Sequence, residues 1–339
     1  MSKLSICLVG VGSIGRRHLR LLQERDDVKV SVVEPNDQSW ARAAAECGAV
    51  PRYSSLEMAL DQEHPDAVAV ATPHQTHAPL VIQALEAGYH VFCEKPMSDS
   101  LSQCVEMLHA AEKSDKVFTV GFMFHFDPYI RKIKQLLDEG RIGKPVHYSS
   151  RFATFNTLKC SITHHQEHTP FSVVMDCIHD TDLLCWLTGK TPDFAFSNAI
   201  QAGDLPLTSA PNAIDTVYRW EDGDFAAFTH FNYIEHPQKH TLEIVGDRGY
   251  IFGDFMKPEI TIGSLDGTTE QIGFEYIFDN VYRAEWSHFI SAVRGEVEPE
   301  NTARSAILST LLMQAQIDSA KLGREVDIRK IARQANFNL

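Results

Sequence analysis

Several features that mark particular classes of protein are missing from this sequence. Its seven cysteines form no Cys-x-x-Cys pair and lie mostly in apolar segments, so we expect buried free thiols and no disulfide framework. No stretch approaches the roughly 18 apolar residues of a membrane span. The short apolar run at the N-terminus is interrupted by glycines and lacks a small-residue cleavage site. We therefore expect a cytoplasmic protein.

Basic residues are also scarce. Lys and Arg number 31 against 45 Asp and Glu, giving a formal net charge of −14. This balance disfavours a nucleic acid or an anionic membrane as the partner, and we expect a small molecule instead. A chain of 339 residues that is 44% hydrophobic is ordinary globular material, too long for one typical core and about right for two domains.

The first third of the chain alternates short β-branched runs with helical segments. Strands are predicted at "LSICLVG", "VKVSVVE", "DAVAVAT", "HVFCEKP" and "KVFTVGF", and helices near 14–24, 37–47, 54–62, 77–87 and 99–113. Capping-box patterns at Ser54 to Glu57 and at Ser100 to Gln103 mark two of the helix starts. The alternation predicts an α/β fold whose first domain, residues 1–122, is a doubly wound parallel sheet of the Rossmann type.

The pattern changes in the remainder, residues 123–339. Alternating segments such as "DTVYRWEDGDFAAFTHFNYI" and "HTLEIVGDRGYIFGD" predict neighbouring antiparallel strands joined at turns, Asp222-Gly223 among them. A helix is predicted through Val173 to Gly189, and two more near 282–294 and 301–322. We expect a second, α+β domain, with the option that its last helices pack back on the first.

A glycine motif follows the first predicted strand. Gly10-x-Gly12-x-x-Gly15 enclose Ser13 and Ile14 at the start of a helix, an arrangement that suits a dinucleotide pyrophosphate. Glu34 ends the second strand about 20 residues further on, where a carboxylate accepts hydrogen bonds from ribose hydroxyls and repels a 2′-phosphate. We expect NAD, although Arg16 and Arg17 keep NADP open, and a glycine turn without a ligand is the structural alternative.

The fourth long strand ends at Glu94-Lys95-Pro96, on the carboxyl edge where such sheets bind ligands. A partly desolvated lysine beside a positive nicotinamide ring would have its charged form disfavoured, which allows proton exchange near neutral pH. An ordinary turn proline and a solvated surface lysine are the alternatives.

These motifs carry a resemblance. "GVGSIGRRH", "ATPHQTH", "EKP", "VGFMFHFDP", "GRIGKPV", "HDTDLLCWLTG" and "IVGDRGYI" occur in the order and spacing of the Gfo/Idh/MocA family of NAD(P)-dependent oxidoreductases, which the chain resembles over nearly its whole length. The resemblance implies a second domain with a large, mostly antiparallel open sheet, and homodimers or homotetramers formed through it. It also implies hydride transfer between NAD(H) and a secondary alcohol or ketone of a sugar, inositol or related polyol.

The same resemblance assigns roles to particular residues. It places Lys95 beside the nicotinamide, often with a cis peptide before Pro96, and it places Thr72, Pro73, His77 and Glu94 along the cofactor site. A loop and helix start, with Thr76 as the cap, is the alternative for that second motif.

The predicted helix near residue 179 supplies the acid–base candidates. Removing a hydride from an alcohol carbon requires that the hydroxyl proton leave too, a task suited to the His179 imidazole. Asp176, three residues earlier on the same predicted helical face, could orient that ring or bind a neighbouring hydroxyl. The family's usual segment has a Gly-Gly pair and a four-residue spacing, so the pattern here indicates a subgroup. A hydrogen-bonded core histidine is the alternative for His179.

Substrate contacts are expected from residues near these candidates. Lys95, His125, Asp176 and His179 form the expected substrate-binding set, with His125 standing where the family often has Arg. We expect Asp180 to face substrate or solvent, and Asp182 to satisfy backbone or basic groups. The histidines at 164, 165 and 168 fit a surface loop or a substrate-facing loop, and no metal site is expected.

Two other functions remain open from the sequence. A NAD-dependent glycosidase or lyase would use a transient oxidation and regenerate its cofactor, and a non-catalytic sugar or cofactor sensor could share the same fold. The sequence does not distinguish the substrate or the direction of reaction.

Overall fold

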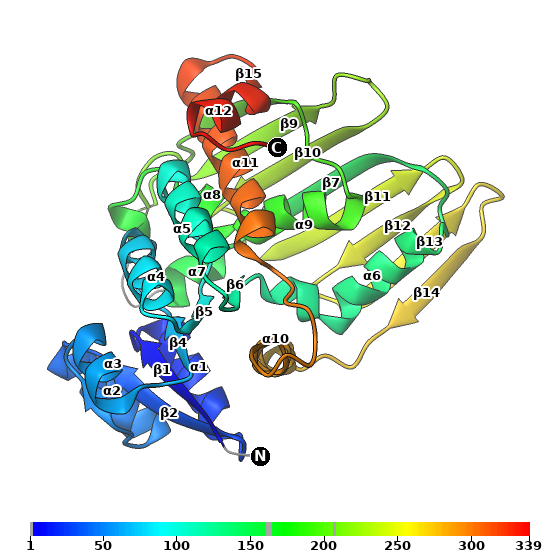
Figure 1. The fold of residues 1–339 in the computed structure, drawn as a ribbon. Helices are drawn as coiled ribbons and strands as arrows, with labels where there is room; N and C mark the ends of the chain where they lie inside the picture. Colours follow the sequence, from blue (N-terminus) through cyan, green and yellow to red (C-terminus); the bar gives the residue numbers. More distant parts are fainter. Residues whose placement is uncertain (1–2, 161–164, 206–207) are drawn as a thin grey trace. The chain divides into compact units, whose positions relative to one another are not determined.

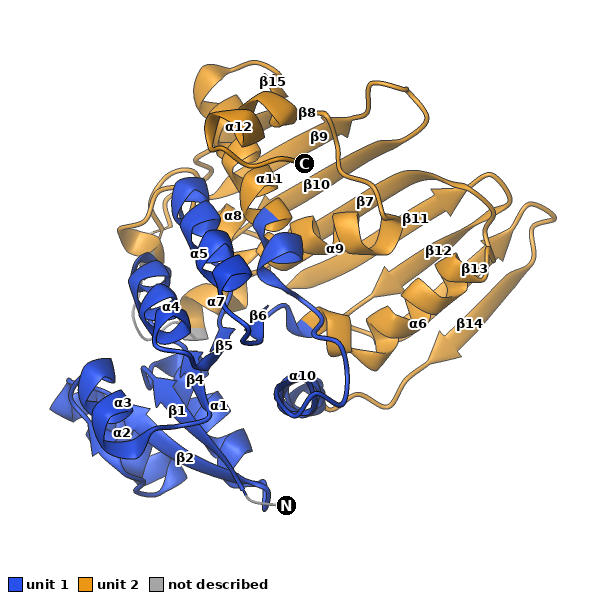
Figure 2. Cartoon of the chain, viewed as in Figure 1, with its two compact units in different colours: residues 1–123, 278–307 blue, residues 124–277, 308–339 orange. Residues whose placement is uncertain are grey.

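The computed structural model describes residues 3–160, 165–205 and 208–339. The chain divides into two compact units, shown in different colours in Figure 2. Unit 1 comprises Met1–Met123 and Phe278–Ile307, and unit 2 comprises Phe124–Ile277 and Leu308–Leu339.

Unit 1 is built on a six-stranded parallel sheet in the order β3-β2-β1-β4-β5-β6, which confirms the predicted doubly wound fold. Its strands are β1 Leu4–Val9, β2 Val28–Val33, β3 Arg52–Tyr53, β4 Ala67–Val70, β5 His90–Cys93 and β6 Phe118–Val120. Its helices are α1 Ser13–Gln23, α2 Asp37–Cys47, α3 Leu56–Glu63, η1 His74–Thr76, α4 His77–Glu86, α5 Leu101–Lys113 and α10 Phe278–Val293 (Figure 1).

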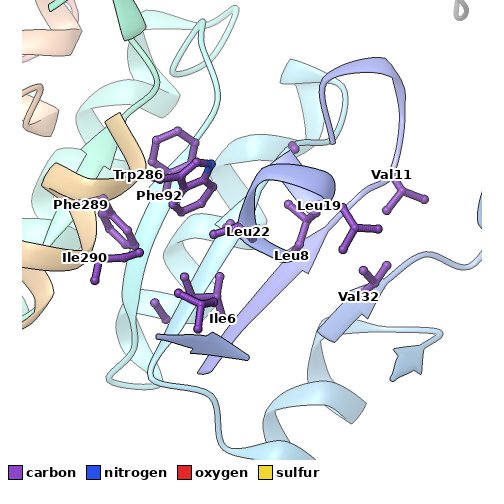
Figure 3. Packing of buried hydrophobic residues seen from close by; sticks show 14 of the residues in the cluster. Ile6, Leu8, Val11, Leu19, Leu22, Val32, Phe92, Trp286, Phe289 and Ile290 are labelled. Atoms are coloured by element: carbon purple, nitrogen blue, oxygen red, sulfur yellow. The ribbon is translucent and has the colours of Figure 1, made fainter. Parts of the chain in front are cut away.

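The core of unit 1 draws on residues far apart in the sequence. Ile6, Cys7 and Leu8 of β1 are almost completely buried, as expected for a strand covered on both faces. Trp286 and Phe289 of α10 join them, and the indole ring centroid of Trp286 lies 4.6 Å from the ring centroid of Phe92 on β5 (Figure 3). Full burial of such a side chain is worth roughly 1.5–3 kcal/mol, so α10 is an integral part of this unit.

Unit 2 contains a nine-stranded sheet in the order β14-β13-β12-β11-β7-β10-β9-β8-β15. All of its strand pairs are antiparallel except β7 with β10, so the prediction of a mostly antiparallel sheet is confirmed. The strands are β7 Pro145–Ala153, β8 Phe194–Ile200, β9 Ala213–Arg219, β10 Ala226–Asn232, β11 Lys239–Gly246, β12 Gly249–Asp254, β13 Glu259–Ser264, β14 Thr269–Gly273 and β15 Val326–Asp327.

Helices of unit 2 cover one face of this sheet (Figure 1). They include η2 Met123–Phe126, α6 Pro128–Asp138, α7 Phe155–Cys160, η3 His165–Glu167, α8 Ser172–Asp176, α9 Ile178–Thr188, α11 Ala303–Leu322 and α12 Ile328–Gln334, with η2 and α11 reaching across a unit boundary in the sequence. Side chains on the strands alternate accordingly, for example buried Tyr218 beside exposed Val217 on β9. None of the helices within the described ranges is long and apolar enough to cross a membrane.

The helix predicted through Val173 to Gly189 is two helices. α8 ends at Asp176 and α9 begins at Ile178, with Cys177 between them at φ −91° and ψ 11°. Asp176 and His179 therefore belong to different helices, and the predicted common helical face is wrong. Gly189 ends α9 in the left-handed conformation at φ +66°, as the sequence predicted.

Two predicted helix caps, and the cap at Thr76 that was named as an alternative, differ from what the sequence indicated. Ser55, rather than Ser54, accepts the backbone N–H of Met58 at the start of α3. Ser100 makes no side-chain cap bond, and its hydroxyl instead lies 2.8 Å from that of Ser102. The hydroxyl of Ser98 accepts the backbone N–H of Ser100 and donates to Gln103. Thr76 does not cap α4 with its side chain either.

Candidate active site

The glycine turn after β1 has the geometry that its motif predicted. Gly10 has a φ of +92°, and a Cβ atom there would lie 2.9 Å from the carbonyl oxygen of Ala71. A Cβ on Gly15 would lie 2.2 Å from the carbonyl oxygen of Gly10, so close helix–strand packing requires glycine. Around Gly12 no described heavy atom lies within 4 Å of a Cβ, which leaves its backbone open to an approaching pyrophosphate at the start of α1.

Glu34 is fixed beside this turn. Its carboxylate accepts the backbone N–H of Val11 at 3.2 Å and that of Asn36 at 2.9 Å. Each oxygen keeps a further lone-pair direction, because an ionised carboxylate offers about four acceptor sites. The group therefore suits the two hydroxyls of an adenosine ribose and opposes a 2′-phosphate.

The two arginines that kept NADP open have carboxylate partners within unit 1. The Arg16 Nε lies 2.7 Å from a carboxylate oxygen of Glu46, and the Arg17 Nε lies 3.4 Å from one of Asp279. The Arg17 guanidinium also lies 5.1 Å from the ring centroid of Tyr282. Their charges are engaged locally, so they give little reason to expect a phosphate on the ribose.

Residues of the loop after β4 connect the glycine turn to the turn after β5. His77 is buried, with Nε2 2.9 Å from the carbonyl oxygen of Thr72 and Nδ1 3.0 Å from that of Pro96. Burial lowers the pKa of His77, while those carbonyls act in the opposite direction. The Thr72 methyl packs toward Gly10, and Pro73 is exposed.

Lys95 is the second residue after β5 and is half-buried, and the Lys95-Pro96 peptide is cis. Glu94, just before it, accepts the Lys95 backbone N–H on Oε2 at 3.0 Å and contacts Nε2 of His18 through Oε1 at 2.8 Å. Burial by itself would raise the pKa of Glu94, but the hydrogen bonds and the nearby Lys95 charge hold that pKa below its usual value. Glu94 is thus a buried anion.

In unit 2, Asp176 lies at the end of α8 and accepts two hydrogen bonds on Oδ2. They come from Gln166 Nε2 at 3.0 Å and from the hydroxyl of Tyr233 at 2.5 Å. Burial and the Asp176 charge raise the pKa of Tyr233 well above its ordinary value, so its hydroxyl remains a donor. His179 follows in the first turn of α9, is 7% exposed, and has its ring centroid 4.9 Å from that of Phe124.

His125 is buried against α9. Its Nε2 lies 2.6 Å from a carboxylate oxygen of Asp182, and its ring stacks on Trp186 with centroids 4.1 Å apart. The hydroxyl of Ser309 donates to the other oxygen of Asp182 at 3.0 Å. Asp182 thus satisfies a basic group and a hydroxyl, much as the sequence suggested.

Asp180 is a correction. Its side chain is completely buried, receives a short hydrogen bond from the Ser150 hydroxyl, and lies 2.9 and 3.0 Å from Nε2 of His240 through its two oxygens. The expectation that Asp180 faces substrate or solvent is therefore wrong, because its carboxylate is bound by Ser150 of β7 and His240 of β11.

The histidine loop is only partly described. His164 and the side chain of His165 lie outside the described residues, and His168 is exposed. Within the ranges that the structure describes, no group of three or more His, Cys, Asp or Glu side chains could hold a metal ion.

Several hydrogen-bond partners of the candidate residues could not be identified from the sequence. Tyr233, His240 and Trp286 stand in no motif that we used, and His18 ends the motif "GVGSIGRRH" without any sign of its partner. Each of the four reaches its carboxylate or histidine partner across at least 57 positions of sequence. By contrast, the motifs located the glycine turn, Thr72, His77, Glu94 and Lys95, which all follow strand ends at the carboxyl edge of the unit 1 sheet.

A parallel sheet with a glycine turn after its first strand and a carboxylate after its second is the arrangement of a dinucleotide-binding domain. Residues 4–122 match a family model described as "Oxidoreductase family, NAD-binding Rossmann fold", and residues 134–328 match "Oxidoreductase family, C-terminal alpha/beta domain". The chain belongs to the Gfo/Idh/MocA oxidoreductase family, as its motifs predicted, and its first unit is an NAD-binding domain.

Relatives match along almost the full length. The chain is 24% identical over 336 residues to myo-inositol 2-dehydrogenase of Thermotoga maritima, covering 97% of this chain and 99% of the relative. It is 26% identical over 330 residues to scyllo-inositol 2-dehydrogenase (NAD(+)) of Bacillus subtilis, covering 95% of each. Its fold is similar, with a TM-score of 0.86 and 17% identity, to an oxidoreductase from Agrobacterium radiobacter in complex with NAD+, L-tartaric acid and magnesium, covering 97% of this chain and 100% of that one.

Proposed function

We propose that the protein transfers a hydride between NAD(H) and a secondary alcohol or ketone of a cyclic polyol, with inositols as the first candidates. The observation that carries this proposal is the full-length similarity to two inositol 2-dehydrogenases, in a chain whose own sequence offers Lys95, Asp176 and His179 as candidates. Family membership supports the redox chemistry, and the names of the relatives support the class of substrate.

The cofactor is proposed to lie along the glycine turn. The backbone N–H groups of Ser13, Ile14 and Gly15 begin α1 and have no acceptor within the helix, so they suit the pyrophosphate. Glu34 accepts the ribose hydroxyls. Thr72, Pro73, His77 and Glu94 are proposed to shape the rest of the cofactor site, with His77 and Glu94 holding its loops. When bound, NAD supplies the acceptor for the hydride.

Lys95 and His179 are proposed to handle the hydroxyl proton during oxidation of the alcohol. A positioned acid or base contributes roughly 10²- to 10⁴-fold to the rate. Asp176, held by Tyr233 and Gln166, is proposed to orient a neighbouring hydroxyl or the imidazole. His125 is proposed to contribute to the substrate-binding set by fixing α9 through Asp182.

An assay with purified protein tests the proposal. NAD is incubated with myo-inositol, scyllo-inositol, aldoses, sugar acids and glycosides, and reduced nicotinamide is followed by absorbance. We expect at least one inositol to reduce NAD at a rate above those of the other members. Conversion of a glycoside without net NADH would instead indicate the glycosidase or lyase function, and cofactor binding with no turnover would indicate a sensor.

We also propose that the uncovered face of the unit 2 sheet forms a homo-oligomer. Phe196 and Phe228 both pair with Val217 in register, and Phe196, Phe228 and Val217 are 44%, 41% and 54% exposed. Exposed apolar patches of this kind mark association surfaces. Sedimentation analysis should show a dimer or tetramer that Val217→Asp dissociates, and a monomeric wild-type protein would contradict the proposal.

The proposed compartment is the cytoplasm. The described thiols at Cys7, Cys47, Cys93, Cys104, Cys177 and Cys185 are free, which supports a reducing environment. Burial raises the pKa of Cys7 to about 12, so that thiol is unreactive. Localisation of a tagged full chain checks this proposal.

A further inference from the structure

Three buried side chains of unit 1 form a hydrogen-bonded chain that ends on the backbone of Lys95. Trp286 Nε1 lies 3.0 Å from His18 Nδ1, and His18 Nε2 lies 2.8 Å from Glu94 Oε1. Glu94 Oε2 then accepts the backbone N–H of Lys95 at 3.0 Å. Trp286, His18 and Glu94 are 1%, 0% and 6% exposed, so water does not replace these bonds readily.

The chain of bonds has only one possible direction. An indole N–H is a donor and never an acceptor, so Nδ1 of His18 must present its lone pair to Trp286. The single hydrogen of the neutral imidazole is then on Nε2, where it donates to Glu94. Glu94 must accept on both oxygens, from His18 and from the Lys95 backbone, which only a carboxylate can do.

The Glu94-Lys95-Pro96 turn is also held on the C-terminal side of Lys95. His77 contacts the carbonyl oxygen of Pro96 at 3.0 Å, so buried side chains engage the backbone both before and after the Lys95 side chain. Edge-to-face contacts of His18 with Phe92 and Tyr282 restrict the imidazole to one orientation.

We propose that Glu94, with His18 and Trp286 behind it, is a positioning residue that fixes the backbone of Lys95 and thereby orients its amine for the proton step. This inference rests on the proposed function for the role of Lys95. It assigns Glu94 to the alignment of a neighbouring group, through the His18 and Lys95 bonds that its two oxygens make. Direct contact of Glu94 with the cofactor is the other outcome of the test.

Glu94→Gln tests the donor-to-acceptor direction of these hydrogen bonds with almost no change in side-chain shape. A glutamine presents one acceptor and one N–H₂ donor, so it must place a donor against either the Lys95 N–H or the His18 Nε2–H. We expect the Lys95 amide proton to exchange with solvent at least tenfold faster, and kcat to fall at least tenfold with KM for the alcohol changed less than threefold.

Trp286→Phe in the Glu94→Gln background is the rescue. Without the indole donor, the hydrogen of His18 can move to Nδ1, and Nε2 can accept from the introduced amide N–H₂, which frees the amide oxygen for Lys95. We expect the double variant to recover most of the lost Lys95 amide protection, and imidazole ¹⁵N shifts to report the changed tautomer of His18. If the double variant does not fold, His18→Gln, which keeps one acceptor and one donor, should preserve the Lys95 amide protection that His18→Leu loses.

Glu285→Gln is the matched control. It makes the same substitution at a buried glutamate next to Trp286 on α10, and neither Glu285 oxygen has a hydrogen-bond partner among the described residues. We expect unchanged Lys95 exchange and kcat.

The outcomes separate this inference from the proposed function. Wild-type Lys95 exchange in Glu94→Gln, or fast Lys95 exchange in both the double variant and His18→Gln, would overturn the positioning role. Loss of NAD affinity in Glu94→Gln with protected Lys95 would instead assign Glu94 to the cofactor. If the wild type oxidises no alcohol, the proposed function fails, while the exchange rates and ¹⁵N shifts still decide whether Glu94 fixes the turn.

Discussion

Each unit contains a buried carboxylate–histidine pair directly beside a proposed acid–base residue. In unit 1 the pair is Glu94 with His18, next to Lys95, and in unit 2 it is Asp180 with His240, next to His179. The two histidines are held differently. His18 is fixed by the Trp286 indole hydrogen bond, whereas His240 is stacked between two phenylalanine rings, Phe152 and Phe255, with centroids 4.0 and 3.8 Å away.

This difference predicts different tolerance to an amide in place of the carboxylate. Ring stacking fixes the plane of His240 but leaves its tautomer free to change, and the Ser150 hydroxyl next to Asp180 can donate or accept. The indole N–H of Trp286 instead fixes the tautomer of His18. In the unit 1 pair the donor and acceptor roles are therefore fixed, whereas in the unit 2 pair they can be exchanged.

The largest expected effect concerns the residues that adjoin the two pairs. Lys95→Ala and His179→Ala should each lower kcat by roughly 10²- to 10⁴-fold, because each removes a proposed proton-handling group. NAD affinity, measured by fluorescence titration, should change little. Lys113→Ala, at an exposed lysine of the same unit as Lys95, serves as the control. A variant at either position with wild-type turnover would remove that residue from the mechanism.

The second prediction compares the carboxylates themselves. Glu94→Gln should lower the free energy of unfolding by about 1–3 kcal/mol, the cost of an unsatisfied buried donor. Asp180→Asn should cost about 1 kcal/mol or less, because His240 and Ser150 can exchange donor and acceptor roles. Urea unfolding of both variants checks this. Equal losses would show that the two histidines do not differ as the structure indicates.

The third prediction concerns a buried carboxyl, Glu285, that has no hydrogen-bond partner among the described residues. Burial, and then the charge of Glu94, raise the pKa of Glu285 well above its ordinary value. The protonated form is favoured in the folded state, so the wild type loses stability as pH rises from the unfolded pKa toward the folded one, at up to about 1.4 kcal/mol per pH unit. Glu285→Gln has no such dependence.

Unfolding measured between pH 4.5 and pH 8 should therefore show Glu285→Gln gaining stability relative to the wild type as pH rises. A constant difference across this range would mean that Glu285 titrates normally and that α10 exposes it to water.

The parts of this fold that could be predicted are those with a local cause. β-branched runs, strand-end glycines and the Glu94-Lys95-Pro96 turn act within a few residues, and they placed the Rossmann sheet and its ligand edge. The break at Cys177 has no such signal, since no glycine or proline interrupts residues 173–186. Asp176, on one side of the break, is held by Tyr233, 57 positions away.

The partners of the buried carboxylates were missed for the same reason. Trp286 stands 268 positions after His18, in a segment whose composition is that of any amphipathic helix. The burial of Asp180 depends on strands β7 and β11, which sequence periodicity identifies as strands without indicating which helix they cover. Motifs therefore predicted the candidate residues, and tertiary pairing decides which of them are held inside.

Direct transfer of hydrogen is the central claim, and one isotopic measurement tests it. The purified protein is incubated with NAD and myo-inositol or scyllo-inositol that carries deuterium on its carbinol carbons, and the NADH formed is analysed by mass spectrometry. We predict NADH one mass unit heavier than that from unlabelled inositol, because the hydride comes from the carbinol carbon. NADH without deuterium from an inositol that is consumed would contradict it.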